Sequence, residues 1–102
     1  MTIQFKERDL EELAKDKPLL GKQKFSAEVI TLFKRRLFQI RNAVNTQDLR
    51  NNKSLHFEKL KEKRYEGKYS IRLNKAYRII FAIDKQGNFE IIMIEEISNH
   101  YA

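Results

Sequence analysis

The stretch Ser70-Ile71-Arg72-Leu73-Asn74-Lys75-Ala76-Tyr77-Arg78-Ile79-Ile80-Phe81 decides the fold. Apolar and polar residues alternate between positions 68 and 73, which is the period of a strand with one buried face. Asn74-Lys75-Ala76 has the composition of a turn, because Asn tolerates left-handed backbone angles. The residues from 77 to 83 are then apolar, apart from Arg78. We therefore predict a strand, a tight turn and a second strand.

Arg78 stands alone as a charge in this second strand, and its presence needs a reason. Burying an unpaired charge is costly, so the side chain must either form an ion pair or open onto a cleft. An ion pair with Glu95 or Glu96 is the structural explanation. A cleft that binds an anion is the functional explanation.

Two helices are expected before this hairpin. Apolar residues at helical spacing between Asp9 and Lys15 predict a short helix that ends before Pro18. Ser26 is a favourable N-cap for a second and longer helix, in which apolar residues recur every three or four positions. The apolar stripe of this helix over residues 26–44 consists of Val29, Ile30, Phe33, Leu37, Ile40 and Val44.

The expected fold is α+β, with residues 1–102 forming a single domain. Residues 3–5 alternate as in a short first strand, Thr46 can cap a short turn, and residues 84–88 form a hairpin turn before a strand over 89–94. We expect two helices packed on one face of a small twisted, mainly antiparallel sheet. The other face would be concave and basic. The helix-facing side would carry Ile71, Leu73, Ile79, Phe81, Ile83 and the strand 89–94.

Composition and charge favour a soluble cytoplasmic protein that binds a polyanion. No apolar run approaches the roughly 20 residues that span a bilayer, and the first residues lack the apolar core of a signal peptide. The chain has no Cys and two His, so we expect neither a metal nor a cofactor. The net charge is +7, and residues 53–78 hold nine basic and three acidic side chains, which gives +6. A basic segment of this kind either binds a polyanion or forms a solvated surface.

Several separated pieces of the sequence resemble one family. They are Leu55-His56-Phe57-Glu58-Lys59-Leu60-Lys61, Gly67-Lys68-Tyr69-Ser70-Ile71-Arg72-Leu73-Asn74, Tyr77-Arg78-Ile79-Ile80-Phe81 and the tail Glu96-Ile97-Ser98-Asn99-His100-Tyr101. In this order they resemble the HigB branch of the RelE/ParE toxin superfamily, whose members are often called plasmid maintenance killer proteins. The resemblance implies the RelE-like toxin fold, in agreement with the pattern. The sequence has Glu62 where most relatives have Gly.

These residues suit RNA cleavage without a metal. The 2′-hydroxyl attacks the adjacent phosphate and the 5′-oxygen leaves, which requires a base, an acid and cations around the phosphate. Arg78 is the first choice for the phosphate, since its charge is permanent and its planar fork matches phosphate oxygens. It matches the Arg of the family's Tyr/Trp-Arg pair. His100 matches the family's C-terminal active-site His and can act as acid or base, and Tyr101 could donate a proton or stack on a base.

His56 and Lys59 are alternatives for one catalytic position, because this chain is longer than some relatives between His56 and Ser70. In one register His56 is catalytic, and in the other Lys59 takes its place. Lys59 and Lys61 match the Lys-bearing part of the family's Leu-x-x-Leu-Lys pattern. In a strand both would point the same way, with Leu60 turned to the core. The candidate RNA-binding residues are Lys61, Lys63, Arg64, Lys68 and Arg72.

The resemblance implies the toxin of a type II toxin–antitoxin system, a ribosome-dependent mRNA endonuclease or mRNA interferase. Toxins of the family cut mRNA in the ribosomal A site and cause growth arrest. They are held inactive by a HigA-like helix-turn-helix antitoxin, through which alone they contact operator DNA. A ParE-like DNA gyrase inhibitor and a non-catalytic RNA-binding module are the alternatives. Proton-transfer groups distinguish the nuclease from both, because inhibition by binding needs none. No membrane partner is expected.

Overall fold

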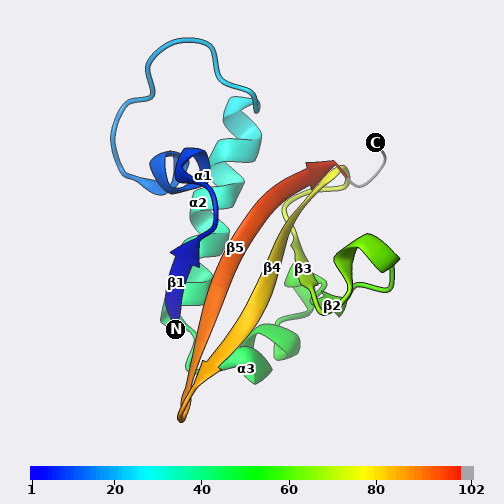
Figure 1. The fold of residues 1–102 in the computed structure, drawn as a ribbon. Helices are drawn as coiled ribbons and strands as arrows, with labels where there is room; N and C mark the ends of the chain where they lie inside the picture. Colours follow the sequence, from blue (N-terminus) through cyan, green and yellow to red (C-terminus); the bar gives the residue numbers. More distant parts are fainter. Residues whose placement is uncertain (100–102) are drawn as a thin grey trace.

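A mixed five-stranded sheet forms the centre of the computed structural model, which describes residues 1–99 (Figure 1). The strands are β1 (Thr2–Phe5), β2 (Glu58–Lys59), β3 (Tyr69–Arg72), β4 (Tyr77–Gln86) and β5 (Phe89–Asn99). They lie in the order β1-β5-β4-β3-β2. β1 runs parallel to β5, and every other neighbouring pair is antiparallel. The expectation of a mainly antiparallel sheet is confirmed.

The described helices are α1 (Arg8–Ala14), α2 (Ala27–Asn42) and α3 (Thr46–Asn51), with the 3₁₀ turns η1 (Lys53–Leu55) and η2 (Lys63–Tyr65). The α+β class is confirmed, but α3 is a third short helix where we expected a turn. Its cap is not Thr46. The side chain of Asn45 accepts a hydrogen bond from the backbone N–H of Asp48 at 3.2 Å. No helix within residues 1–99 is long and apolar enough to cross a membrane.

α2 supplies the largest share of the core from the helices. The Ser26 hydroxyl accepts a hydrogen bond from the N–H of Val29 at 3.2 Å, so the expected N-cap is confirmed. The side chains of the stripe from Val29 to Ile40 are buried. The helix ends at Asn42, however, and Val44 is 82% exposed. Its assignment to the stripe was wrong, because the helical period no longer applies beyond the helix end.

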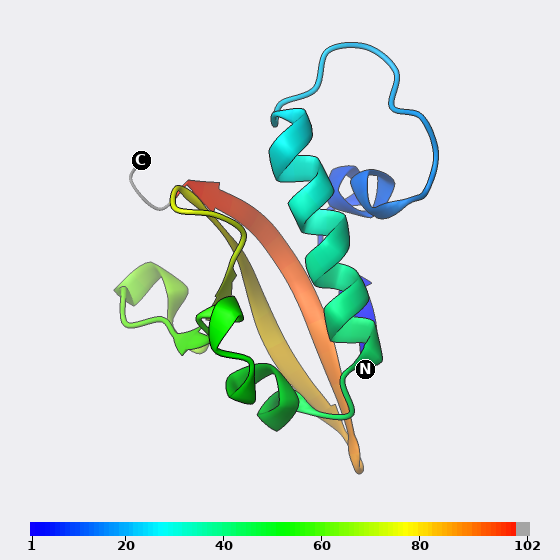
Figure 2. The same ribbon diagram turned by 180° about the vertical axis from the view of Figure 1, so that it is seen from behind.

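One face of the sheet packs against these helices, as Figure 2 shows for α2 alongside β5. Ile71, Leu73, Ile79 and Phe81 are buried in one cluster with the stripe of α2, and Ile83 packs against it as a half-buried residue. The expected helix-facing side of the hairpin is therefore confirmed. Phe89 is an exception, because it lies beside the β4–β5 turn and is 76% exposed.

β5 carries one extra residue, Glu95. Ile80 of β4 lies opposite Glu96, whereas the next residue, Phe81, lies opposite Ile94. A one-residue bulge reverses the alternation of side chains along a strand. Ile94 and Ile97 therefore both belong to the core, three positions apart.

Candidate active site

Arg78 lies on the face of the sheet opposite the helices. Its strand neighbours in the register are Arg72 on β3 and Ser98 on β5. Its side chain is only 9% exposed. Two arginines directly opposite each other repel, so this pair of positions favours a site for an anion.

The Arg78 guanidinium has carboxylates near it but is not fully satisfied by them. NH1 lies 3.9 Å from Glu58 Oε1, and NH2 lies 3.5 Å from Glu62 Oε1. Both carboxylates are about half exposed to solvent. The Nε atom is buried, and no described residue accepts a hydrogen bond from it. Buried donors are normally paired, so the orphaned N–H of this buried Arg calls for an explanation, and a bound anion is one that suits its charge.

The structural explanation of Arg78 required an ion pair with Glu95 or Glu96. Both of these carboxylates bind other residues. Glu95 forms an ion pair with Lys68 at 2.5 Å. Glu96 accepts a hydrogen bond from the hydroxyl of Tyr65. The alternative that Arg78 pairs with either of them is wrong, because residues 58–65 cross this face of the sheet and bring Glu58 and Glu62 to Arg78 instead.

A small hollow of about 40 Å³ opens beside Arg78. His56, Glu58, Arg72 and Lys75 are among the residues that line it. The β3–β4 turn shapes one side, because the Asn74 side chain accepts hydrogen bonds from the N–H groups of Ala76 and Tyr77 at 2.9 and 2.8 Å. The predicted turn is thus confirmed. The structure brings together three of the sequence-based candidates, namely His56, Arg72 and Arg78.

His56 has an unusual backbone conformation, with φ 47° and ψ 51°. It is the one non-glycine residue with positive φ in the described part of the chain. For a residue other than Gly this conformation costs on the order of 1–3 kcal/mol and is common at functional sites. His56 caps the end of η1, and its Nε2 lies 3.4 Å from NH1 of Arg72.

Lys59 and Lys61 do not join this hollow. In the register Glu58 pairs with Ser70 and Lys59 with Tyr69, so Lys59 belongs to the helix-facing side of the sheet and Glu58 to the Arg78 side. Lys61 is exposed, and Leu60 is buried but lies outside the main core cluster.

The segment around η2 covers part of the Arg78 face. The centre of the Arg78 guanidinium lies 5.8 Å from the centroid of the Tyr65 ring, and that of Arg64 lies 4.7 Å from it. Burial, together with the hydrogen bond to Glu96, raises the pKa of the Tyr65 phenol above its usual value. Lys63 and Arg64 are exposed, whereas Lys68 is already engaged by Glu95. We expected this face to be basic, but it carries charges of both signs. The acidic side chains of Glu58, Glu62 and Glu96 lie among the basic ones.

Sequence reasoning missed Glu58, Glu62 and Tyr65 as neighbours of Arg78. Their residue types carried no signal for this, because their place depends on how the segment folds across the sheet. His100 and Tyr101 lie outside the described residues. The strand that precedes them ends at Asn99, one residue beyond the partner of Arg78.

The arrangement can hold an anion and move a proton. Arg78 and Arg72 supply fixed positive charge, and His56 and Glu58 are groups that can accept or donate a proton. Within residues 1–99, no three His, Asp or Glu side chains gather in a way that could hold a metal ion.

Comparison with known proteins gives one family and one fold. A family model described as the RelE-like toxin of type II toxin-antitoxin system HigB matches residues 4–94. No protein with a curated functional description matches the sequence significantly. Among solved structures, a YoeB/ParE toxin from Agrobacterium tumefaciens is similar, with 18% sequence identity and a TM-score of 0.56 over 99% of this chain and 100% of that chain. At this identity the similarity concerns the fold alone.

Proposed function

Because the chain belongs to the HigB-like family of RelE-like toxins from type II toxin–antitoxin systems, we propose that it is an mRNA endonuclease that acts on the translating ribosome. Cleavage proceeds by attack of the 2′-hydroxyl on the adjacent phosphate, with the 5′-oxygen as leaving group. The observation that carries this proposal is the orphaned, buried Nε of Arg78 beside His56 and Arg72.

In this proposal Arg78 binds the scissile phosphate. Two phosphate oxygens accept hydrogen bonds, one from the unused Nε–H and one from a terminal N–H, which is the bidentate geometry that guanidinium groups favour. Arg72, on the adjacent strand, places a second positive charge close to this phosphate or to the next phosphate of the RNA. As the phosphorane-like transition state gains negative charge, these fixed cations stabilise it more than the ground state.

Proton transfer is carried out by residues that line the hollow or that come after β5 in the sequence. His56 and Glu58 are the candidates among the described residues, and His100 and Tyr101 are those expected from the family resemblance. Lys59 is a weaker candidate, since its strand position faces away from Arg78. The exposed cations Lys61, Lys63 and Arg64 serve the RNA backbone rather than the chemistry.

The partners follow from the same proposal. The substrate is mRNA on ribosomes in the cytoplasm, and the inhibitor is a HigA-like antitoxin with a helix-turn-helix domain. Operator DNA is contacted through that antitoxin.

The test is to express the protein and map mRNA 5′ ends on translating ribosomes. The wild type should produce new ends at the time of growth arrest. His56→Asn and Glu58→Gln are the most informative variants, because they remove the proton-transfer group without disturbing the fold. Asn tolerates the left-handed backbone of position 56, and Gln keeps the shape of Glu. Loss of a positioned acid or base should slow cleavage by about 10²–10⁴. His100→Ala tests the candidate outside the described residues.

Growth arrest without new mRNA ends would overturn the nuclease. DNA supercoiling by gyrase would then be measured in the same cells. Cleavage unchanged in all three folded variants would leave the nuclease but remove these groups from proton transfer.

A further inference from the structure

Arg78 can offer a phosphate one edge of its guanidinium group, and Glu62 already stands at that edge. The Nε–H of an arginine and its NH2 nitrogen (Nη2) point the same way, so together they form a pair of donors that binds an oxyanion side-on. Glu62 Oε1 lies 3.5 Å from Nη2. The neighbouring Nε is buried from solvent, and no described residue accepts its hydrogen bond. A phosphate therefore reaches both donors only when a group that covers them moves.

The covering segment is residues 60–68, which we call the cover loop. The N–H of Leu60 donates a hydrogen bond to the carbonyl of Lys68 at 3.0 Å, and this bond closes the segment into a loop. Within the loop, the N–H of Tyr65 donates to the carbonyl of Glu62 at 2.9 Å. The Tyr65 ring centroid lies 5.8 Å from the centre of the Arg78 guanidinium. The backbone at Glu62 is thus fixed close to Arg78.

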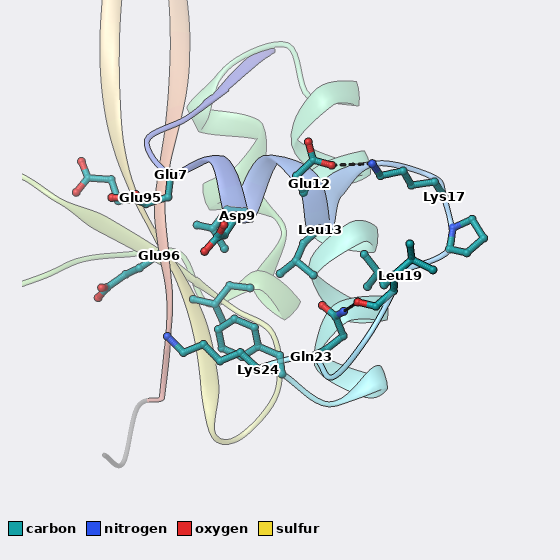
Figure 3. Close-up of a pocket in the computed structure, with 15 residues that line it drawn as sticks. Glu7, Asp9, Glu12, Leu13, Lys17, Leu19, Gln23, Lys24, Glu95 and Glu96 are labelled. Carbon is teal, nitrogen blue, oxygen red and sulfur yellow. Dashed lines mark hydrogen bonds and ion pairs between the residues drawn. The ribbon is translucent and has the colours of Figure 1, made fainter.

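Two side-chain contacts also tie the cover loop to β5. The Tyr65 hydroxyl donates a hydrogen bond to Glu96, and Lys68 forms an ion pair with Glu95. Figure 3 shows the groove between β5 and α1, and there the side chains of Glu95 and Glu96 extend away from the other lining residues. Both carboxylates therefore serve the cover loop rather than that groove. With its backbone held at several points, the loop can expose Arg78 most easily by moving one side chain.

The side chain of Glu62 is the part that is free to move. It is about half exposed, and it makes no capping hydrogen bond to η2 although Glu62 is the N-cap residue. It can turn away from Arg78 without breaking a backbone bond of the loop. Glu58, the other carboxylate near Arg78, is 3.9 Å from the NH1 nitrogen, which does not share an edge with Nε. Glu62 is therefore the carboxylate that competes for the side-on edge.

We propose that Glu62 is a specificity-determining residue, which holds the side-on edge of Arg78 in the free protein and must be displaced by the phosphate of the substrate. This deepens the proposed function, because it rests on Arg78 binding a phosphate of RNA. The carboxylate also repels an arriving phosphate, since both are negative. RNA that contacts Arg78 alone binds weakly for both reasons. RNA that is already held in place by further contacts displaces the carboxylate, so Glu62 selects against RNA that is not positioned.

The probe is a short single-stranded RNA in which every 2′-hydroxyl is methylated, so that it can bind but cannot be cut. Its dissociation constant for the full-length protein is measured by fluorescence anisotropy at one fixed salt concentration. Glu62→Gln should bind this RNA about three- to tenfold more tightly than the wild type, because the competing charge is gone. Glu62→Ala should act in the same direction, since it also lacks the carboxylate.

Glu66→Gln is the matched control. Glu66 is exposed and lies in the same loop, at the other end of η2, so the change of net charge is the same. Among the described residues, the carboxylates within ion-pair distance of Arg78 are those of Glu58 and Glu62. Glu66→Gln should therefore tighten RNA binding by less than about twofold.

Nuclear magnetic resonance reports the displacement itself. The Nε–H signal of Arg78 is identified by its loss in Arg78→Met. It should shift when the methylated RNA is added to the wild type, because the Nε–H gains an acceptor. In Glu62→Gln the same shift should be complete at a lower RNA concentration.

Three results would overturn the role of Glu62. The first is a dissociation constant of Glu62→Gln within about twofold of both the wild type and Glu66→Gln. The second is an Arg78 Nε–H signal that does not move at saturating RNA, and the third is an absence of RNA binding in every variant. Tighter binding by Glu62→Gln in a protein that cuts no mRNA would instead overturn the proposed nuclease, and Glu62 would remain the competitor of the bound phosphate.

Discussion

Replacing Arg78 by Met should abolish activity without unfolding the protein. A stabilising donor removed from the transition state costs about 10²–10³ in rate, so cleavage of mRNA on ribosomes should fall by at least this factor. The fold should be as stable as before or more stable. This combination separates a functional Arg from a structural one.

The stability change follows from the surroundings of the guanidinium. A buried donor without a partner, such as Arg78 Nε, costs about 1–3 kcal/mol. The attraction to Glu58 and Glu62 is weak, because both carboxylates are about half exposed and lie 3.9 and 3.5 Å away, so it contributes about 0–1 kcal/mol. Met is flexible enough to fill the space left behind. The net expectation is a gain of about 0–3 kcal/mol in the free energy of unfolding.

The measurement is urea unfolding followed by circular dichroism, with mRNA cleavage assayed in parallel. Arg41→Met is the control, since Arg41 is exposed on α2 and its replacement should change stability by no more than about 0.5 kcal/mol. A loss of more than about 2 kcal/mol in Arg78→Met, with cleavage retained, would refute the reasoning and make Arg78 a structural residue.

Further predictions concern the core, the acid limb of stability and RNA binding. Phe33→Ala should lower the free energy of unfolding by about 3–5 kcal/mol, because Phe33 is fully buried. Phe38→Ala on the same helix should change it by no more than about 0.5 kcal/mol, because Phe38 is 66% exposed. Equal losses of stability for the two variants in denaturant titrations would contradict the core assignment. Glu90 accepts hydrogen bonds from the N–H and hydroxyl of Thr46, and the backbone bond is the main cause of its lowered pKa. Because the folded-state pKa is depressed, this contribution is complete above the ordinary Glu pKa and is lost as pH falls through the lowered value. Acid titration of Glu90→Gln should show a smaller loss of stability than the wild type over that window, and an identical profile would exclude the bond. Arg64→Ala should reduce the slope of log affinity for single-stranded RNA against log salt by about 0.7 if Arg64 contacts a phosphate, and an unchanged slope would remove it from the interface.

The hairpin and the long helix could be predicted because local periodicity reports burial directly. Alternation around Ile71 and the three- and four-residue steps around Phe33 each follow from one element facing one core. Asn74 could be assigned to the turn because its side chain bonds the backbone a few residues ahead.

The surroundings of Arg78 could not be predicted in the same way. A lone charge in an apolar strand signals that something must compensate it, but not what does so. Glu58 and Glu62 reach it because the segment between β2 and β3 folds over the sheet, which is a non-local event. Helix ends are similarly hard to place, and Val44 was assigned to the core because nothing in its own residue type marks the end at Asn42.

The extra residue at Glu95 makes the end of β5 sensitive to chain length rather than to side-chain identity. Ile94 and Ile97 face the core only because one residue is inserted between two otherwise regular stretches, and Ser98 is thereby placed beside Arg78. Deleting a single residue here would turn every later side chain of the strand to the opposite face of the sheet. Ile97 would then leave the core, and Ser98 would no longer lie beside Arg78. Substitutions between residues 95 and 98 do not change which side chains face the core. Natural variation in this part of the chain should therefore consist of replacements, with single-residue insertions and deletions confined to the 84–88 turn.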